Sequence, residues 1–204
     1  MTTQIRNATL SPIAALTLTL AAATQFASAA TYSNVSATTN AAIAASWMND
    51  TDYISAPGTV SSFVQVSPGN SAAANGALWM QPTRVQFDQQ NIVSSASGDD
   101  ADATEALSYE FTIDSDQIAT LSSKHTLRLF WGVAPEAVSS MRLVNVATGE
   151  VLVDDIFNTL DARRYDIRLD AGTYAVEYTV NTITVGTGGF QFNTGFAMRL
   201  AAGN

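Results

Sequence analysis

Residues 190–200, with the sequence FQFNTGFAMRL, alternate between two kinds of side chain. The even-numbered positions are large and apolar apart from Thr194, and the odd-numbered positions are polar or small. A period of two is typical of a β-strand with one buried face. A helix would spread the same apolar residues around its circumference, so the stretch predicts a strand.

The same alternation recurs along the chain. Further strands are predicted at residues 59–66, 78–87, 107–113, 127–133, 141–146, 150–153, 164–169 and 174–180. Ala147, Thr148 and Gly149 predict a tight hairpin turn, in which the glycine supplies a positive φ. Pro82 removes a backbone donor inside 78–87, so that strand should lie at a sheet edge or split at a bulge.

Helix is expected only in short stretches, at residues 41–48 and 114–121. About nine strands with little helix predict an all-β fold, namely an antiparallel β-sandwich of jelly-roll type. A closed barrel is the alternative.

Composition excludes several classes of protein. The 204 residues are 47% hydrophobic and 13% charged, which argues against a disordered chain. The 9 Lys and Arg residues face 18 Asp and Glu, a net charge of −9 that offers no basic footprint for nucleic acid. The chain has no cysteine, so it cannot be a disulfide scaffold, a thiol enzyme or a cysteine zinc site.

Residues 1–29 have the layout of a secretory signal peptide. Arg6 precedes an apolar run at 13–23, which is too short to span a bilayer, and Ala27, Ser28 and Ala29 form a cleavage site. A short buried helix is the alternative. We therefore expect an exported protein, extracellular or in a bacterial envelope or periplasm, with no membrane span. Residues 30–48 would form an N-terminal extension or first strand, and 49–204 a single β-sandwich domain.

The stretch LDAGTYAVEYTV, residues 169–180, resembles a strand of bacterial secreted β-sandwich modules, including prepeptidase C-terminal-type domains. In those modules the strand often follows a turn, for which Gly172 is suited. The resemblance implies a secreted sandwich and no activity.

An acidic segment, residues 98–105, is the best candidate for a metal site. Asp99, Asp100, Asp102 and Glu105 offer the oxygen ligands that calcium prefers. The EF-hand pattern fails, because Thr104 stands where Asp or Asn is required and Glu105 where the turn requires glycine. A solvated acidic loop is the alternative to a calcium site.

No catalytic constellation stands out. His125 is the only histidine, so a multi-histidine zinc site is excluded, and no G-x-S-x-G motif is present. We expect a protein that is not an enzyme. Trp47 and Trp79 are candidates for stacking on sugar rings, with extracellular polysaccharide as the partner. Trp131 is in phase with Leu127 and Leu129, so it is expected in the core.

The N-terminal segment 35–47 also alternates. Its more apolar face consists of Val35, Ala37, Thr39, Ala41, Ile43 and Trp47. Such a segment could add as a strand to a neighbouring copy, and repeated exchange would build a homopolymer. The alternatives are an ordinary first strand of its own sandwich or a short helix.

Together these patterns predict a secreted, non-catalytic structural or adhesive protein of an extracellular matrix, fibre or surface layer that self-assembles by strand exchange. The alternative is a secreted carbohydrate-binding module with a structural calcium ion.

Overall fold

The computed structural model describes residues 29–44, 48–67, 69–98, 100–132, 135–158, 161–184 and 186–203, without the side chains of 66 and 67. The predicted signal peptide (apart from Ala29), Trp47 and Asp99 lie outside these residues. The described part is built from strands, with no α-helix. It therefore contains no helix long and apolar enough to cross a membrane.

Twelve strands make up the fold. They are β1 (Thr31–Ile43), β2 (Met48–Ile54), β3 (Gly58–Ser67), β4 (Asn70–Gln81), β5 (Arg84–Ser95), β6 (Ala101–Ile113), β7 (Gln117–Gly132), β8 (Glu136–Asn145), β9 (Val151–Asn158), β10 (Arg163–Leu169), β11 (Gly172–Thr184) and β12 (Gly188–Ala202).

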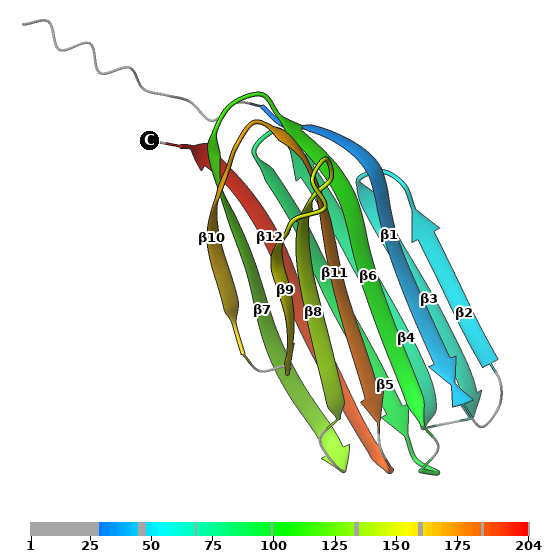
Figure 1. Cartoon of the computed structure of the whole chain (residues 1–204). Helices are drawn as coiled ribbons and strands as arrows, with labels where there is room; N and C mark the ends of the chain where they lie inside the picture. The colour runs from blue at the N-terminus through cyan, green and yellow to red at the C-terminus, as the bar shows by residue number, and fades with distance from the viewer. Residues whose placement is uncertain are drawn as a thin grey trace, which may run out of the picture.

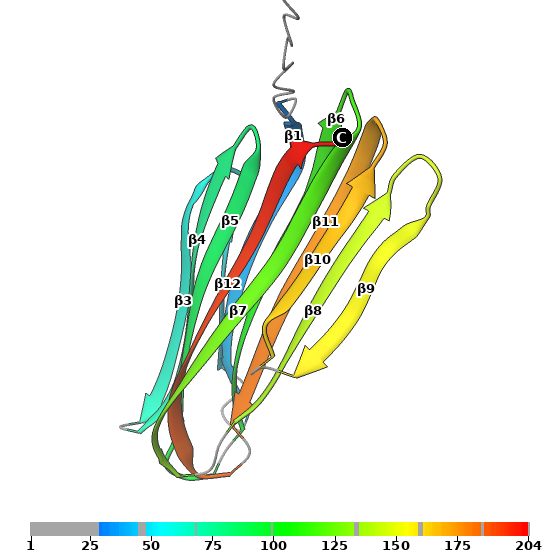
Figure 2. The same cartoon turned by 90° about the vertical axis from the view of Figure 1, so that its left-hand side faces the viewer.

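The strands form two antiparallel sheets of six that face each other (Figures 1 and 2). Sheet A has the order β2-β1-β6-β11-β8-β9, and sheet B has the order β10-β7-β12-β5-β4-β3. The expected all-β, antiparallel architecture is confirmed. The sheets remain separate, each with its own edge strands.

The predicted number of strands, about nine, was too low. Pro82 and Thr83 form the turn of a β4–β5 hairpin, where the sequence suggested one interrupted strand. β2 escaped prediction because almost all of its residues are exposed and mostly polar, so it shows no alternation. The helical turn expected at 114–121 is also wrong, because Gln117 already begins β7.

The core lies between the sheets and is filled by the inward side chains of both. Its largest buried members are aromatic, among them Tyr109, Tyr178, Phe87 and Phe196. The ring of Tyr178 on sheet A stacks on that of Phe196 on sheet B, with centroids 5.0 Å apart. The stretch 190–200 that predicted the fold is the central strand of sheet B, where Phe190, Phe192, Phe196, Met198 and Leu200 point inward.

Aspartates tie the two sheets together along both flanks. On one flank, Asp52 and Asp50 of β2 accept hydrogen bonds from the backbone amides of Ser61 (2.9 Å) and Phe63 (2.8 Å) on β3. On the other flank, Asp155 of β9 accepts hydrogen bonds from the Tyr165 hydroxyl and from Arg163 Nε on β10. An edge strand normally exposes unpaired amides, so the β2 carboxylates occupy donors that could otherwise bind another strand.

Candidate functional site

The outer face of sheet B is hollowed across its middle strands. One cavity of about 350 Å³ is lined by Trp79, Gln81, Arg84, Gln86 and Asp88. A second, of about 730 Å³, shares the last three of these residues and extends over β12, β7 and β10. A third, of about 640 Å³, shares Asp88 and reaches β3. We call this continuous depression the sheet B groove.

Small residues make its floor. Gly195 on β12 lies between Asp88 of β5 and Lys124 of β7, and Ala197 lies between Gln86 and Ser122. A Cβ added to Gly195 would lie 3.3 Å from Asp88 Oδ1. The longer side chains of the flanking strands therefore rise on both sides of β12.

Trp79 stands at one end of the groove and is 51% exposed. It lies on β4, opposite Gln86 of β5, while its neighbour Leu78 is buried in the core. Of the two tryptophans predicted to bind sugars, Trp79 is thus placed in a cavity, and Trp47 lies outside the described residues. Trp131, expected in the core, is 42% exposed beyond the end of β10.

Polar side chains on β5 form a hydrogen-bonded row along the groove. Arg84 Nη2 donates to Gln86 Oε1, and Gln86 Nε2 donates to Asp88 Oδ2 at 2.8 Å. Farther along, Gln90 Nε2 donates to Asn193 Oδ1 of β12 at 3.2 Å. These contacts hold the side chains in position and leave part of their hydrogen-bonding capacity for a ligand.

The two outer faces carry opposite charge. Outward positions of sheet B hold six basic side chains, Arg84, Lys124, Arg128, Arg164, Arg168 and Arg199, and two acidic ones, Asp88 and Asp166. Outward positions of sheet A hold five acidic side chains, Asp102, Glu110, Glu136, Asp154 and Glu177, and a single basic one, Arg142.

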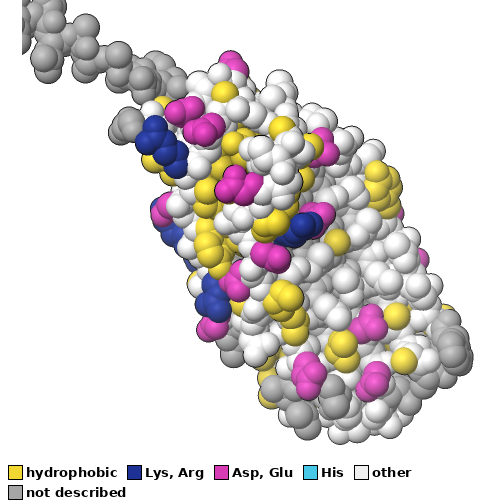
Figure 3. All heavy atoms as spheres, in the orientation of Figure 1, with side chains coloured by type: hydrophobic (Ala, Val, Ile, Leu, Met, Phe, Trp, Pro, Cys, Tyr) yellow, Lys and Arg dark blue, Asp and Glu magenta, His cyan; other side chains and the backbone are white. Residues whose placement is uncertain are grey.

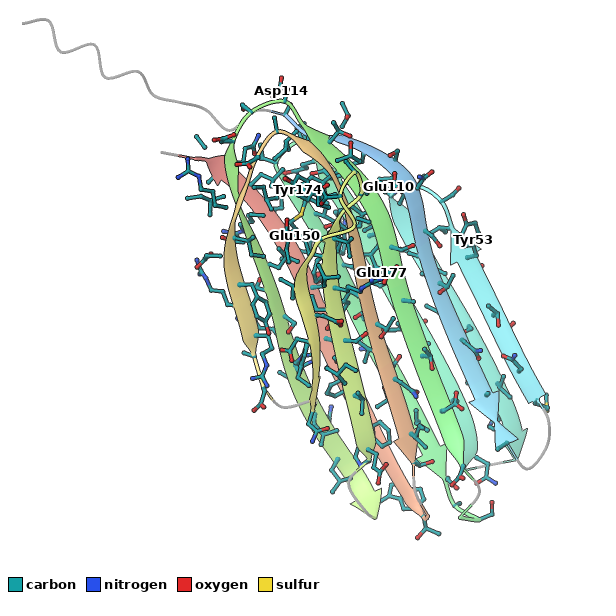
Figure 4. The ribbon with its side chains drawn as sticks, in the orientation of Figure 1. Tyr53, Glu110, Asp114, Glu150, Tyr174 and Glu177 are labelled. Carbon is teal, nitrogen blue, oxygen red and sulfur yellow. The ribbon has the colours of Figure 1, made fainter. Side chains whose placement is uncertain are left out.

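Figure 3 shows the sheet A face with scattered acidic side chains, while most basic ones lie along the β10 side. Glu110 and Glu177 stand on the neighbouring strands β6 and β11 (Figure 4). Arg142 lies 3.4 Å from Glu177. Sheet A therefore presents a negative surface in which its one basic residue is already paired.

Four of the sheet B cations have no acidic partner among the described residues. Arg164 pairs with Asp166 and Arg168 with Asp116. Arg84, Lys124, Arg128 and Arg199 form no ion pair with any described residue. Arg84 and Arg199 are direct cross-strand neighbours, an arrangement of like charges that ordinarily destabilises a sheet.

The acidic stretch predicted to bind calcium is divided between two faces of β6. Asp102 is directed outward, and partial burial raises its pKa. Glu105 points between the sheets and is 1% exposed. Asp100 is exposed, and the described residues contain no group of three or more acidic or histidine side chains able to hold a metal. Calcium binding by Asp99, Asp100 and Asp102 stays a prediction, which a melting temperature raised by calcium would support.

Glu105 is an unusual occupant of the core. Burial raises the pKa of its carboxyl well above the ordinary value, opposed by the facing backbone amides of Gln90 and Asn75. Neither amide reaches hydrogen-bonding geometry, and neither carboxyl oxygen has a hydrogen-bond partner among the described residues. The raised pKa favours the neutral, protonated form of this carboxyl inside the sandwich.

Apart from Trp47, which lies outside the described residues, the residues predicted for strand exchange lie in β1 of their own chain. Ala37, Thr39, Ala41 and Ile43 point inward and are buried, and Val35 packs against the core. β1 pairs with β6 on one side and with β2 on the other. Within this chain the described part of the segment forms an ordinary strand with both edges occupied, and exchange of this strand between copies stays a prediction.

His125 lies away from the groove, on the inner side of β7. Its ring is 5.6 Å from those of Phe192 and Phe157, and burial lowers its pKa, opposed by Asp161. The ring of His125 thus packs against two aromatic rings.

The sequence gives little sign of the sheet B groove. Its cations come from four strands, β5, β7, β10 and β12, and apart from Arg164, which follows Arg163, none has a Lys or Arg beside it in the sequence. The available signal is that these cations occupy outward positions of strands whose inward positions are apolar. Strand order, which the sequence does not supply, brings them together.

The chain matches no known family and shows no significant similarity to any curated protein. The resemblance of residues 169–180 to prepeptidase C-terminal-type modules stays a prediction about one strand.

Proposed function

We propose that the protein is a secreted, non-catalytic adhesive component of an extracellular matrix that holds polysaccharide in the sheet B groove. The observation that supports this most directly is the position of Trp79, half exposed at the end of a continuous depression lined by hydrogen-bonding side chains. Secretion rests on the predicted signal peptide, and N-terminal sequencing of the exported protein would test it.

The chemistry of the groove suits a sugar chain. The apolar face of a pyranose packs on an aromatic ring, and Trp79 offers such a ring. Gln86 and Asp88 lie beside it and can bind hydroxyl groups. The depression continues over several strands, so an extended chain suits it better than a single sugar.

Replacing Trp79 by alanine tests this assignment. The variant should keep its fold, because the side chain is half exposed, and lose retention on polysaccharides that the parent binds in affinity electrophoresis. Tyr53→Ala is the matched control, since Tyr53 is 55% exposed on the opposite sheet. Equal retention of Trp79→Ala and the parent on every polysaccharide would reject the site.

Self-assembly is a second candidate, favoured by the opposite charges of the two faces. The acidic face of sheet A could stack on the basic face of sheet B of the next copy, a head-to-tail contact that does not close and so builds layers or fibres. Electron microscopy of the mature protein should then show assemblies at low salt that disperse at high salt. The variant Glu110→Lys/Glu177→Lys should remain dispersed; dispersed particles from the parent at low salt would reject this candidate.

A further inference from the structure

We infer that the ligand of the sheet B groove is an acidic polysaccharide, one that carries carboxylate groups on its sugars. This inference rests on the proposed function and names the class of polysaccharide. It starts from a contrast within one molecule: the chain has a net charge of −9, yet the larger cavity is lined by three cations, Arg84, Lys124 and Arg199, that form no ion pair with a described residue, against the single carboxylate of Asp88.

Arg84 and Arg199 are the centre of the argument. They face each other across β5 and β12, so their Cβ atoms are separated by roughly 5 Å, as in any directly opposed pair. Both line the larger cavity. A guanidinium binds a carboxylate through two parallel hydrogen bonds, and a carboxylate between two such groups would neutralise their repulsion.

The cations continue beyond the lining of the three cavities, along the outer face of sheet B, as far as Arg128. Arg199, Gly195 and Gln191 follow one another at four-residue steps on β12, and the last two lie opposite Lys124 and Arg128 of β7. At about 3.3 Å per strand residue, each step covers roughly 13 Å. Positive charge is therefore spread over a length suited to a polymer with charges at intervals.

The tryptophan and the cations belong to the same surface. The row Trp79, Gln86 and Ala197 lies between the row of Arg84 and Arg199 and the row of Asp88, Gly195 and Lys124. A sugar chain that stacks on Trp79 would therefore place its groups within reach of Arg84 on one side and of Asp88 on the other, with Lys124 two strands beyond β5. An aromatic ring beside cations favours an acidic sugar polymer over a polyanion without sugar rings, because only the sugar polymer can stack on Trp79.

The test compares three probes of similar length by isothermal titration calorimetry: polygalacturonate, neutral pullulan and poly-glutamate. The parent protein is compared with Trp79→Ala, with Arg84→Gln/Arg199→Gln and with the control Arg168→Gln, a cation on β10 already paired with Asp116. Arg84→Lys/Arg199→Lys keeps the charge but removes the planar fork. Circular dichroism and melting curves verify that each variant is folded.

Polygalacturonate should bind the parent most tightly, and more weakly as salt increases. The double glutamine variant should lose at least about tenfold in affinity, as expected for charge-assisted hydrogen bonds, with the lysine variant in between. Trp79→Ala should also weaken binding, and Arg168→Gln should not.

Three results would overturn the inference in distinguishable ways. Equal affinity for pullulan and polygalacturonate, unchanged by the arginine substitutions, rejects the acidic class and leaves polysaccharide binding intact. Binding of poly-glutamate as tight as that of polygalacturonate, with Trp79→Ala unaffected, rejects a sugar site and favours an acidic protein surface such as sheet A of another copy. Failure of both sugar polymers to bind rejects the inference and the proposed function together.

Discussion

Arg84 on β5 and Arg199 on β12 stand directly opposite each other in the sheet, and neither forms an ion pair with a described residue. Both are outward-facing, at the wall of a groove whose floor is glycine and alanine. A folded protein gains nothing from this pair, because like charges at such positions repel. The pair is instead suited to an anionic group supplied from outside.

The first prediction is that Arg199→Gln stabilises the free protein. Removing the repulsion from Arg84 should raise the free energy of unfolding by about 0.2–1 kcal/mol. The gain should shrink at high salt, where the repulsion is screened. Urea denaturation at low and high salt measures it, with Arg168→Gln as the ion-paired control; a loss of stability at both salts would contradict the prediction.

The second prediction concerns the buried carboxyl of Glu105. Its pKa is raised in the folded protein, so above the ordinary value of 4.5 the unfolded chain releases a proton that the folded chain keeps. The free energy of unfolding therefore falls as pH rises from that value towards the folded-state pKa. Glu105→Gln removes this loss.

The glutamine variant should match the parent near pH 4 and exceed it at pH 7. Each unit of pKa shift corresponds to about 1.4 kcal/mol, and each kcal/mol to roughly 2–4 °C in Tm for a chain of this size. Calorimetry at the two pH values measures the difference. Glu110→Gln, on the outward face of the same strand, is the control; equal Tm values for Glu105→Gln and the parent at pH 7 would refute the argument.

The third prediction concerns the aspartates that cap the edge of β3. Replacing Asp50 and Asp52 by alanine should expose the amides of Ser61 and Phe63, which then exchange hydrogen faster. The freed edge should also promote association between copies. Hydrogen-exchange mass spectrometry of residues 58–67 and light scattering measure the two effects, and Asp154→Ala on β9 is the control.

Acid should weaken the same cap. Hydrogen bonds from the backbone amides of Ser61 and Tyr53 lower the pKa of Asp52 below its ordinary 3.8. The stabilising contribution is complete above that value and disappears as pH falls through the lowered pKa. Exchange at Ser61 that is equally slow in the parent and in Asp52→Ala at neutral pH would show that the carboxylate does not act as a cap.

The fourth prediction concerns Gly76, which packs under the ring of Phe87. A Cβ at this position would lie 2.7 Å from Phe87 Cε2, and Phe87 is fully buried. Gly76→Ala should therefore destabilise the protein by about 1–3 kcal/mol, the usual cost of overpacking a core. Gly58→Ala is the control, because its nearest contacts are at 3.9 Å; similar denaturation midpoints for both variants would contradict the prediction.

Much of the fold was predictable from local patterns. Strands such as residues 190–200 and 174–180 have one apolar face, and this alternation reports directly which side is buried. β2 was not predictable, because all of its residues except Ile54 are exposed, and it is held by its pairing with β1 and by aspartates that bond to β3. The position of β2 therefore depends on tertiary contacts, which a local sequence pattern does not show.

The candidate site was only partly predictable. The exposure of Trp79 was one of two options left open by its sequence, because Leu78 and Met80 beside it are both apolar. The pairing of Arg84 with Arg199 depends on β5 and β12 lying side by side, and these residues are far apart in the chain. Asp102 and Glu105, which the acidic stretch groups together, lie on opposite faces of β6 because they are three residues apart on one strand.

Because the outer faces of the two sheets carry opposite charge, the molecule should adsorb to a charged surface in one orientation. Near an anionic surface, the electric field of that surface would orient the basic face of sheet B toward it. Glu110, Glu177 and the other sheet A carboxylates would then face the solvent. Each adsorbed molecule would then restore the negative sign of the surface that attracted it. Adsorption would then continue beyond a monolayer, because each layer exposes an acidic sheet A face that attracts the basic sheet B face of further molecules.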